Sequence, residues 1–148
     1  LIEMGSADDV IYNLRGSSNG FLNQHKLAVK DFDKAISINP RILIYYKNRV
    51  VSRFNIGNNK GAIEDYDRLI EFDQKDINAY LNRGNIKKLI KDSNGACEDW
   101  TTAKELGSEE AKSKIKKFCK LYEMKKEMNI DDKDLINFKK KFDEKIKN

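Results

Sequence analysis

A 34-residue period runs through the first three quarters of the chain and constrains its fold more than any other sequence feature. Shifting the sequence against itself by one period superimposes three successive segments. The aligned columns hold tyrosine (Tyr12, Tyr46, Tyr80), arginine (Arg15, Arg49, Arg83), alanine (Ala28, Ala62, Ala96), aspartate (Asp31, Asp65, Asp99) and an aromatic residue (Phe32, Tyr66, Trp100). A fixed period of this length is typical of repeat architectures, in which each unit buries its apolar face against its neighbours.

Each unit is predicted to hold two helices, because its apolar residues recur at helical spacing rather than in alternation. In the first unit Ile11, Tyr12 and Gly16 share one face, and Ala28, Phe32, Ala35 and Ile36 share another. Turn or helix-capping residues separate the two halves at the same phase in every unit: Asn23-Gln24-His25, Gly57-Asn58-Asn59 and Lys91-Asp92-Ser93. The sequence therefore predicts helix pairs of about 14 residues per helix, each helix roughly 20 Å long.

These residues resemble the pattern of the tetratricopeptide-repeat family, which has an aromatic residue, Leu-Gly, Ala-x3-aromatic and a closing proline within each repeat. The matching residues are Tyr12, Gly16, Ala28, Phe32, Ala35 and Pro40; then Tyr46, Ala62 and Tyr66; then Tyr80, Gly84, Ala96, Trp100 and Ala103. The chain departs from the pattern with arginine for leucine in all three units, Val50 for glycine, Leu69 for alanine and Gln74 for proline.

The resemblance implies an all-α, right-handed α-solenoid of three tetratricopeptide repeats followed by a capping helix. The expected segments are a lead-in over 1–8, repeats over 9–42, 43–76 and 77–110, a capping helix over 111–128 and a basic C-terminal helix over 129–148. The capping helix has an apolar stripe of Ala111, Ile115, Phe118, Cys119 and Tyr122. A further amphipathic helix is predicted at 133–147, with Leu135, Phe138, Phe142 and Ile146 facing inward and Asp131 or Asp132 as its N-cap.

The arginine and aspartate columns recur in step, which leaves two interpretations open. Arg15, Arg49 and Arg83 could pair with Asp31, Asp65 and Asp99 as a ladder of ion pairs between helices. Alternatively, both columns are solvated surface charge, since exposed ion pairs contribute only about 0–1 kcal/mol.

In the resembled family the first helix of each pair lines a concave groove, and we expect a protein or peptide partner to bind there. The first-helix residues that packing leaves free are Val10, Asn13, Leu14, Ser17, Ile44, Lys47, Asn48, Val51, Asn78, Leu81, Asn82 and Asn85. Asparagine can donate and accept hydrogen bonds at once, so this surface suits an extended peptide or a helix. The chain holds 15 asparagines, so composition alone could also place several there. We therefore predict a protein-interaction adaptor or scaffold.

Co-chaperone members of the family grip a C-terminal carboxylate with lysine and asparagine on one first helix, asparagine on the next and two basic residues on the third. When the family's carboxylate-binding positions are aligned from the first unit of this chain (the first frame), the matching residues are Asn13, Ser17, Asn48, Asn78 and Asn82. Of these, only Asn48 is the residue type that the family has. When the alignment starts one unit later (the second frame), the matching residues are Lys47, Val51 and Asn82, with Lys116 or Lys117 as basic residues. A carboxylate needs converging charge-assisted donors, so the second frame is a partial match.

The two cysteines lie where the last repeat and the capping helix are expected to touch. Cys97 and Cys119 are either two reduced, buried thiols, which is the commoner case, or a disulfide that locks the capping helix. No signal peptide is recognisable. The compartment therefore stays open: cytoplasmic by default, exported or periplasmic if the cysteines are bridged.

Composition argues against catalysis and leaves one alternative function. The single histidine, His25, lies in a turn, and no phosphate loop, nucleophile elbow, metal-binding motif or membrane span is recognisable, so we expect no enzyme, cofactor, metal or small-molecule substrate.

The net charge of +5 comes from residues 111–148, which hold 13 basic and 7 acidic residues. The alternative is therefore that the lysine-rich C-terminal helices bind a polyanion, either nucleic acid or an anionic membrane surface. No arginine occurs in residues 111–148 to read bases, which disfavours nucleic acid.

Overall fold

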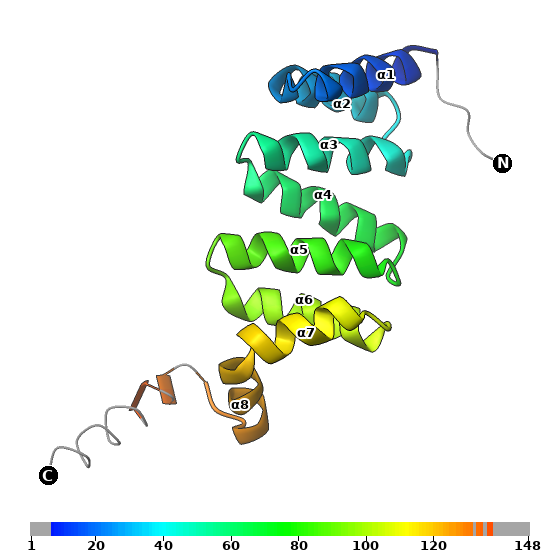
Figure 1. The fold of residues 1–148 in the computed structure, drawn as a ribbon. Coiled ribbons are helices and arrows are strands. Elements are labelled where there is room, and N and C mark those ends of the chain that lie inside the picture. The colour runs from blue at the N-terminus through cyan, green and yellow to red at the C-terminus, as the bar shows by residue number, and fades with distance from the viewer. Residues whose placement is uncertain (1–6, 132, 135, 138–148) are drawn as a thin grey trace, which may run out of the picture.

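The computed structural model describes residues 7–131, 133–134 and 136–137 of the 148-residue chain. Its elements are α1 (Ala7–Phe21), α2 (His25–Ile38), α3 (Leu43–Asn55), α4 (Asn59–Phe72), α5 (Ile77–Leu89), α6 (Ser93–Glu105), α7 (Glu109–Phe118) and α8 (Lys120–Met128), and this part of the chain has no strand. Figure 1 shows the helices stacked in chain order from α1 to α7, with α8 turned away at the end of the stack. The predicted all-α solenoid is confirmed. The helix predicted at 133–147 falls mostly outside the described residues.

The turns inside the helix pairs follow the same period as the helices. Asn23, Gly57 and Lys91 all have positive φ (59°, 75° and 68°), the left-handed conformation that commonly ends a helix. The next residue in two of the turns caps the second helix: Asn58 Oδ1 accepts a hydrogen bond from Gly61 N, and Asp92 Oδ1 accepts one from Gly95 N, both at 2.9 Å. The same turn conformation therefore recurs in all three helix pairs.

Small residues let the helices approach closely enough for large aromatic side chains to fill the remaining space. Phe32 and Trp100 are buried against α1 and α5, where Gly16 and Gly84 leave room for the rings. A Cβ at Gly84 would lie 2.7 Å from Trp100 Nε1 and 3.2 Å from Ala96 O. The middle pair has Val50 at the matching position, in a cluster with Ala62 and Ile86 against which Tyr66 packs. The aromatic residue is therefore buried in the outer pairs and only partly buried in the middle one.

The C-terminal cap differs from the single helix expected over 111–128. The helix ends at Phe118, Cys119 takes a non-helical conformation (φ −108°, ψ 11°), and α8 then begins at Lys120. Ala111, Ile115 and Cys119 are buried as the apolar stripe predicted, whereas Phe118 is largely exposed and lies beside the Trp100 ring, with 5.9 Å between ring centroids. Helix α8 has no fully buried residue, but its Tyr122 packs, partly buried, against the cluster that contains Cys97 and Ile115, as the stripe predicted. The cap therefore consists of two short helices, α7 and α8, instead of one long helix.

A disulfide joins α6 to the end of α7. Cys97 and Cys119 are bonded, and both are buried in the cluster that contains Trp100 and Ile115. Of the two states left open by the sequence, the structure has the bridged one. The bond lies where the helical path of the cap breaks, so it ties the last turn of α7 to the third repeat.

We predict that Gly84→Ala destabilises the protein by about 1–2 kcal/mol, although alanine is the better helix former, because its methyl group would overlap the Trp100 ring. Gly20→Ala is the matched control. Its Cβ would meet only Ser52 Oγ at 3.8 Å, so we expect a gain of about 0.5–1 kcal/mol. Chemical denaturation of both variants measures the difference, and a gain at both positions would refute the tight packing at Gly84.

We predict that reducing the disulfide loosens the cap before the rest of the stack. Its half-cystines are 22 residues apart, for which loop-closure entropy corresponds to about 3 kcal/mol. Amide hydrogen exchange should accelerate in α7 on addition of a reductant and change little in α3, since repeat proteins open locally. A Cys97→Ala/Cys119→Ala variant should show no response to the reductant. Equal acceleration throughout the wild-type chain would contradict a local role.

Candidate functional site

The arginine and aspartate columns form a ladder of ion pairs between the two helices of each pair. Arg49 donates from Nε and Nη2 to Asp65 at 3.1 and 2.5 Å, and Arg83 donates to Asp99 at 3.0 and 2.6 Å. Arg15 makes the same bidentate contact with Asp31. All three aspartates are buried. The interpretation as solvated surface charge is therefore wrong, and the ion-pair interpretation is confirmed.

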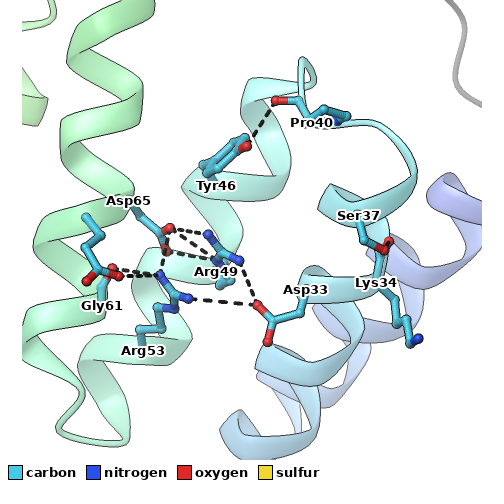
Figure 2. Close-up of polar contacts among 10 residues, drawn as sticks. Asp33, Lys34, Ser37, Pro40, Tyr46, Arg49, Arg53, Gly61 and Asp65 are labelled. Carbon is cyan, nitrogen blue, oxygen red and sulfur yellow. Dashed lines mark hydrogen bonds and ion pairs between the residues drawn. The ribbon is translucent and has the colours of Figure 1, made fainter.

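A second set of carboxylates, not recognised in the sequence, links consecutive pairs. Arg49 Nη1 donates to Asp33 of α2 at 2.7 Å, and Arg83 Nη1 donates to Asp67 of α4 at 2.6 Å. Each of these guanidinium groups thus joins three helices, as Figure 2 shows for Arg49. Asp33 and Asp67 are themselves one repeat apart, so the signal was present in the sequence.

Further donors and aromatic rings complete each step of the ladder. Asn19, Arg53 and Lys87 share one repeat position and contact Asp31, Asp65 and Asp99 at 2.9, 2.9 and 3.0 Å. The arginines also lie over the rings of Tyr12, Tyr46 and Tyr80, with the guanidinium carbon 5.4–5.5 Å from the ring centroid.

The ladder is a structural feature, and its arginines stay protonated. Burial lowers the pKa of the Arg83 guanidinium, but the hydrogen bonds to Asp99 and Asp67 more than offset this, so the pKa is raised overall. Both Arg83 and Asp99 have their polar atoms occupied by other side chains of the protein. The ladder therefore fixes one face of α1, α3 and α5 against the second helices, and the opposite faces of these helices lie outside it.

Those opposite faces carry most of the residues predicted to line the groove, and we call them the inner wall. Val10, Leu14, Ile44 and Val51 are 44–61% exposed. Lys47, Asn78 and Asn82 are also exposed, and Asn13, Ser17, Asn48 and Asn85 are half-buried. Figure 1 shows α1, α3 and α5 running nearly parallel, so their matching positions succeed one another along the stack.

One predicted wall residue is placed wrongly, and one has a further contact. Leu81 is buried in the cluster with Trp100 and Ile115, because it points toward α6 and α7 rather than away from them. Asn85 uses its side-chain oxygen to accept a hydrogen bond from Trp100 Nε1 at 3.2 Å. Leu81 therefore belongs to the core, and the Asn85 amide is already partly engaged.

Amides from α1 and α3 are joined on the wall beside a small hollow. Asn48 Nδ2 donates to Asn13 Oδ1 at 2.9 Å and lies 3.5 Å from Ser17 Oγ. The hollow next to them, about 240 Å³ in volume, is lined by Ser17, Gly20, Phe21, His25, Phe32, Asn48, Val51 and Ser52. Apolar and polar groups therefore line the same recess.

Counting on by one further repeat places the matching wall positions on α7, where the side chains are basic. Positions one repeat apart read Val10, Ile44, Asn78, Lys112 in one row and Leu14, Asn48, Asn82, Lys116 in the next. All but Asn48 are exposed. The wall thus passes from aliphatic at α1, through aliphatic and amide at α3 and amide at α5, to basic at α7.

Other kinds of site find little support in the described residues. Within them no cluster of three or more His, Cys, Asp or Glu side chains could hold a metal ion, and no helix is both long and apolar enough to cross a membrane.

Sequence profiles match two parts of this architecture. The profile described as tetratricopeptide repeat matches residues 10–42, and the profile described as TPR repeat matches residues 52–89. The chain belongs to the tetratricopeptide-repeat (TPR) family. Comparison with curated proteins by sequence finds no match.

Solved TPR domains share the fold of this TPR chain. The first TPR of Spaghetti (RPAP3), bound to the HSP90 peptide SRMEEVD, has a TM-score of 0.68 at 18% identity, covering 82% of this chain and 98% of that one. The Arabidopsis OM64 TPR domain has a TM-score of 0.65 at 24% identity, covering 76% of this chain and 95% of that one. The second TPR domain of human RPAP3, in complex with the HSP70 peptide SGPTIEEVD, has a TM-score of 0.64 at 19% identity. The match covers 76% of this chain and 98% of that one. At these identities the likeness extends to the fold alone.

We predict that Arg49→Met lowers the free energy of unfolding by about 3 kcal/mol, because it removes the main partner of the buried Asp65 and releases Asp33 of the preceding pair. Arg68→Met is the control. Among the acidic side chains of the described residues, Arg68 pairs with the exposed Glu71 alone, and the Tyr46 hydroxyl, which it also contacts, keeps its hydrogen bond to Pro40 O, so we expect a change within about 0.5 kcal/mol. Urea denaturation measures both. A loss below about 1 kcal/mol for Arg49→Met would place the ladder among weak surface ion pairs.

Proposed function

We propose that the chain is an adaptor that binds a segment of another protein along the inner wall. The observation that carries this proposal is the row of exposed aliphatic side chains next to hydrogen-bonding amides. Folding buries apolar side chains where it can, and an ordered row left exposed on parallel helices suits a ligand with its own apolar side chains. The peptides held by the RPAP3 domains support the choice of an extended segment as ligand.

The wall favours a ligand with a definite direction. Val10, Leu14 and Ile44 at the α1 end offer apolar contacts, whereas Lys112 and Lys116 on α7 offer positive charge. Lys47 and Lys116 have no ion pair within the described part of the chain, so both are free to meet a carboxylate. We therefore propose a segment with aliphatic residues toward α1 and acidic residues, or a terminal carboxylate, toward α7.

The carboxylate-binding residues expected from the family are better placed in the second frame than in the first. In the first frame, Asn13 and Asn48 bond to each other and no cation is present. In the second, Lys47, Asn82 and Lys116 supply two cations and one amide from α3, α5 and α7. Val51 replaces a polar residue there, so any carboxylate would have fewer donors than a full set.

The test is a selection of peptides displayed on phage against the folded chain, followed by titration of the selected peptides. We predict that they carry aliphatic residues at one end and acidic residues at the other, and that Val51→Glu and Lys116→Glu each weaken them at least about tenfold. Lys60→Glu, an exposed change on α4, is the matched control and should have no effect.

Two measurements identify what would contradict the proposal. Amidating the C-terminus of a selected peptide reports whether a terminal carboxylate is read or only acidic side chains. A salt series separates peptide binding from polyanion binding, since counterion release gives a steep dependence on salt. Peptides insensitive to Val51→Glu and Lys116→Glu, or displaced by heparin with a steep salt slope, would refute binding along the wall.

A further inference from the structure

A recess opens in the inner wall between α1 and α3, near the ends of these helices that lead into the turns. It is the hollow of about 240 Å³ beside the amide pair of Asn13 and Asn48, and we call it the wall pocket. Sites for drug-sized molecules commonly have volumes of about 300–1,000 Å³. The wall pocket is therefore suited to one side chain of a bound segment rather than to a whole small molecule.

The wall pocket exists because two of its lining residues are small. Gly20 of α1 and Ser52 of α3 line it, and the matching positions one repeat later hold Phe54 and Ile86. Among the described side chains, a Cβ on Gly20 would meet only Ser52 Oγ, at 3.8 Å, so the space above the α1 backbone is open. Ile86, by contrast, is 5% exposed and lies in an apolar cluster. The first step of the wall therefore lacks an aromatic and an aliphatic side chain that the second step has.

The lining of the wall pocket combines apolar sides with a polar floor. Phe21 and Val51 are 88% and 56% exposed and lie at its mouth, whereas the Phe32 ring is buried. Ser52 is 2% exposed, and within the described part of the chain its hydroxyl group contacts only the His25 ring, with 3.4 Å between Oγ and Nδ1. This distance is long for a hydrogen bond, so the hydroxyl group keeps the capacity to bond to a ligand.

These features distinguish between the side chains that could enter. None of the described lining residues is Asp, Glu, Lys or Arg, so a charged side chain would lose its hydration without gaining an opposite charge. Leucine or isoleucine would cover the apolar sides but give the Ser52 hydroxyl no partner. Tyrosine has a large apolar ring with one hydroxyl group at its tip, and a buried tyrosine usually forms a hydrogen bond through that group. Tyrosine therefore matches both parts of the lining.

We propose that the wall pocket is an anchor site for one tyrosine side chain of the segment that binds along the inner wall. The inference rests on the proposed adaptor function and adds a residue type that the bound segment carries. The ring packs against Phe21, Phe32 and Val51, and the phenolic hydroxyl forms a hydrogen bond with Ser52 Oγ. Because the wall pocket lies at the α1 end of the wall, the tyrosine belongs among the aliphatic residues of the segment, away from its acidic end.

Two protein variants test whether the wall pocket holds the tyrosine. Gly20→Phe fills the pocket with the side chain that α3 carries at the matching position, Phe54. Circular dichroism and chemical denaturation check that this variant folds. Lys88→Phe is the matched control, since it adds the same ring at the corresponding exposed position of α5, outside the pocket.

Peptides displayed on phage are selected in parallel against the intact chain and against both variants. The wild-type chain and Lys88→Phe should enrich tyrosine at one position near the aliphatic end of the peptides. Gly20→Phe should select peptides that keep the aliphatic and acidic ends and lack the tyrosine. The two proposals can fail separately: the two-ended pattern without tyrosine would refute the anchor site alone, and tyrosine without that pattern would refute the direction proposed for the wall ligand.

Titration of one selected peptide then tests the chemistry of the anchor. Replacing its tyrosine with alanine should weaken binding at least about tenfold, since buried aromatic anchors carry much of the binding energy of an interface. Replacing the tyrosine with phenylalanine should weaken binding at least about threefold, because one hydrogen bond is lost. Ser52→Ala in the protein should remove the difference between the tyrosine and phenylalanine peptides.

Four results would overturn the anchor site. In the selections, they are no enrichment of tyrosine by the wild-type chain and continued enrichment by Gly20→Phe. In the titrations, they are a phenylalanine peptide that binds as tightly as its tyrosine parent and a preference for tyrosine that Ser52→Ala leaves unchanged. The titrations do not use Gly20→Phe, so they decide the question even if that variant does not fold.

Discussion

The guanidinium ladder is the interaction on which the rest of this architecture depends. Arg49 and Arg83 each join three helices through two carboxylates, one from their own pair and one from the pair before. A planar guanidinium can serve two carboxylates at fixed angles, which the single ammonium of lysine cannot. In each of these two repeats, the position that a leucine holds in the family pattern thus carries a directional contact, so geometry as well as burial sets the register between pairs.

Fixing the first helices in this way also decides which of their faces remain free. Tyrosine, arginine and the small residues of α3 and α5 point into the stack, and residues such as Ile44, Val51 and Asn82 are left outside. The inner wall is thus a consequence of the ladder. Its change from aliphatic to basic along the stack arises because the same positions hold different residues in successive units.

The two ends of the stack are finished differently. At the C-terminal end, α7 covers Trp100 and Ala103, and the disulfide between Cys97 and Cys119 fastens it in place. At the other end, Ile11 and Arg15 present to solvent the surface that later repeats use for stacking.

The sequence by itself determined the helix pairs, the turns and most of the wall, because a fixed period repeats the local signals of spacing, capping and small residues three times. It also placed the arginine and aspartate columns in step, although it could not tell a buried ladder from solvated charge, since burial depends on neighbouring helices. Only the tertiary structure brought Asp33 to Arg49, turned Leu81 into the core, broke the cap at Cys119 and joined that residue to Cys97. Each of these depends on how two helices distant in the chain meet, and periodicity along one chain says nothing of the rotation between them.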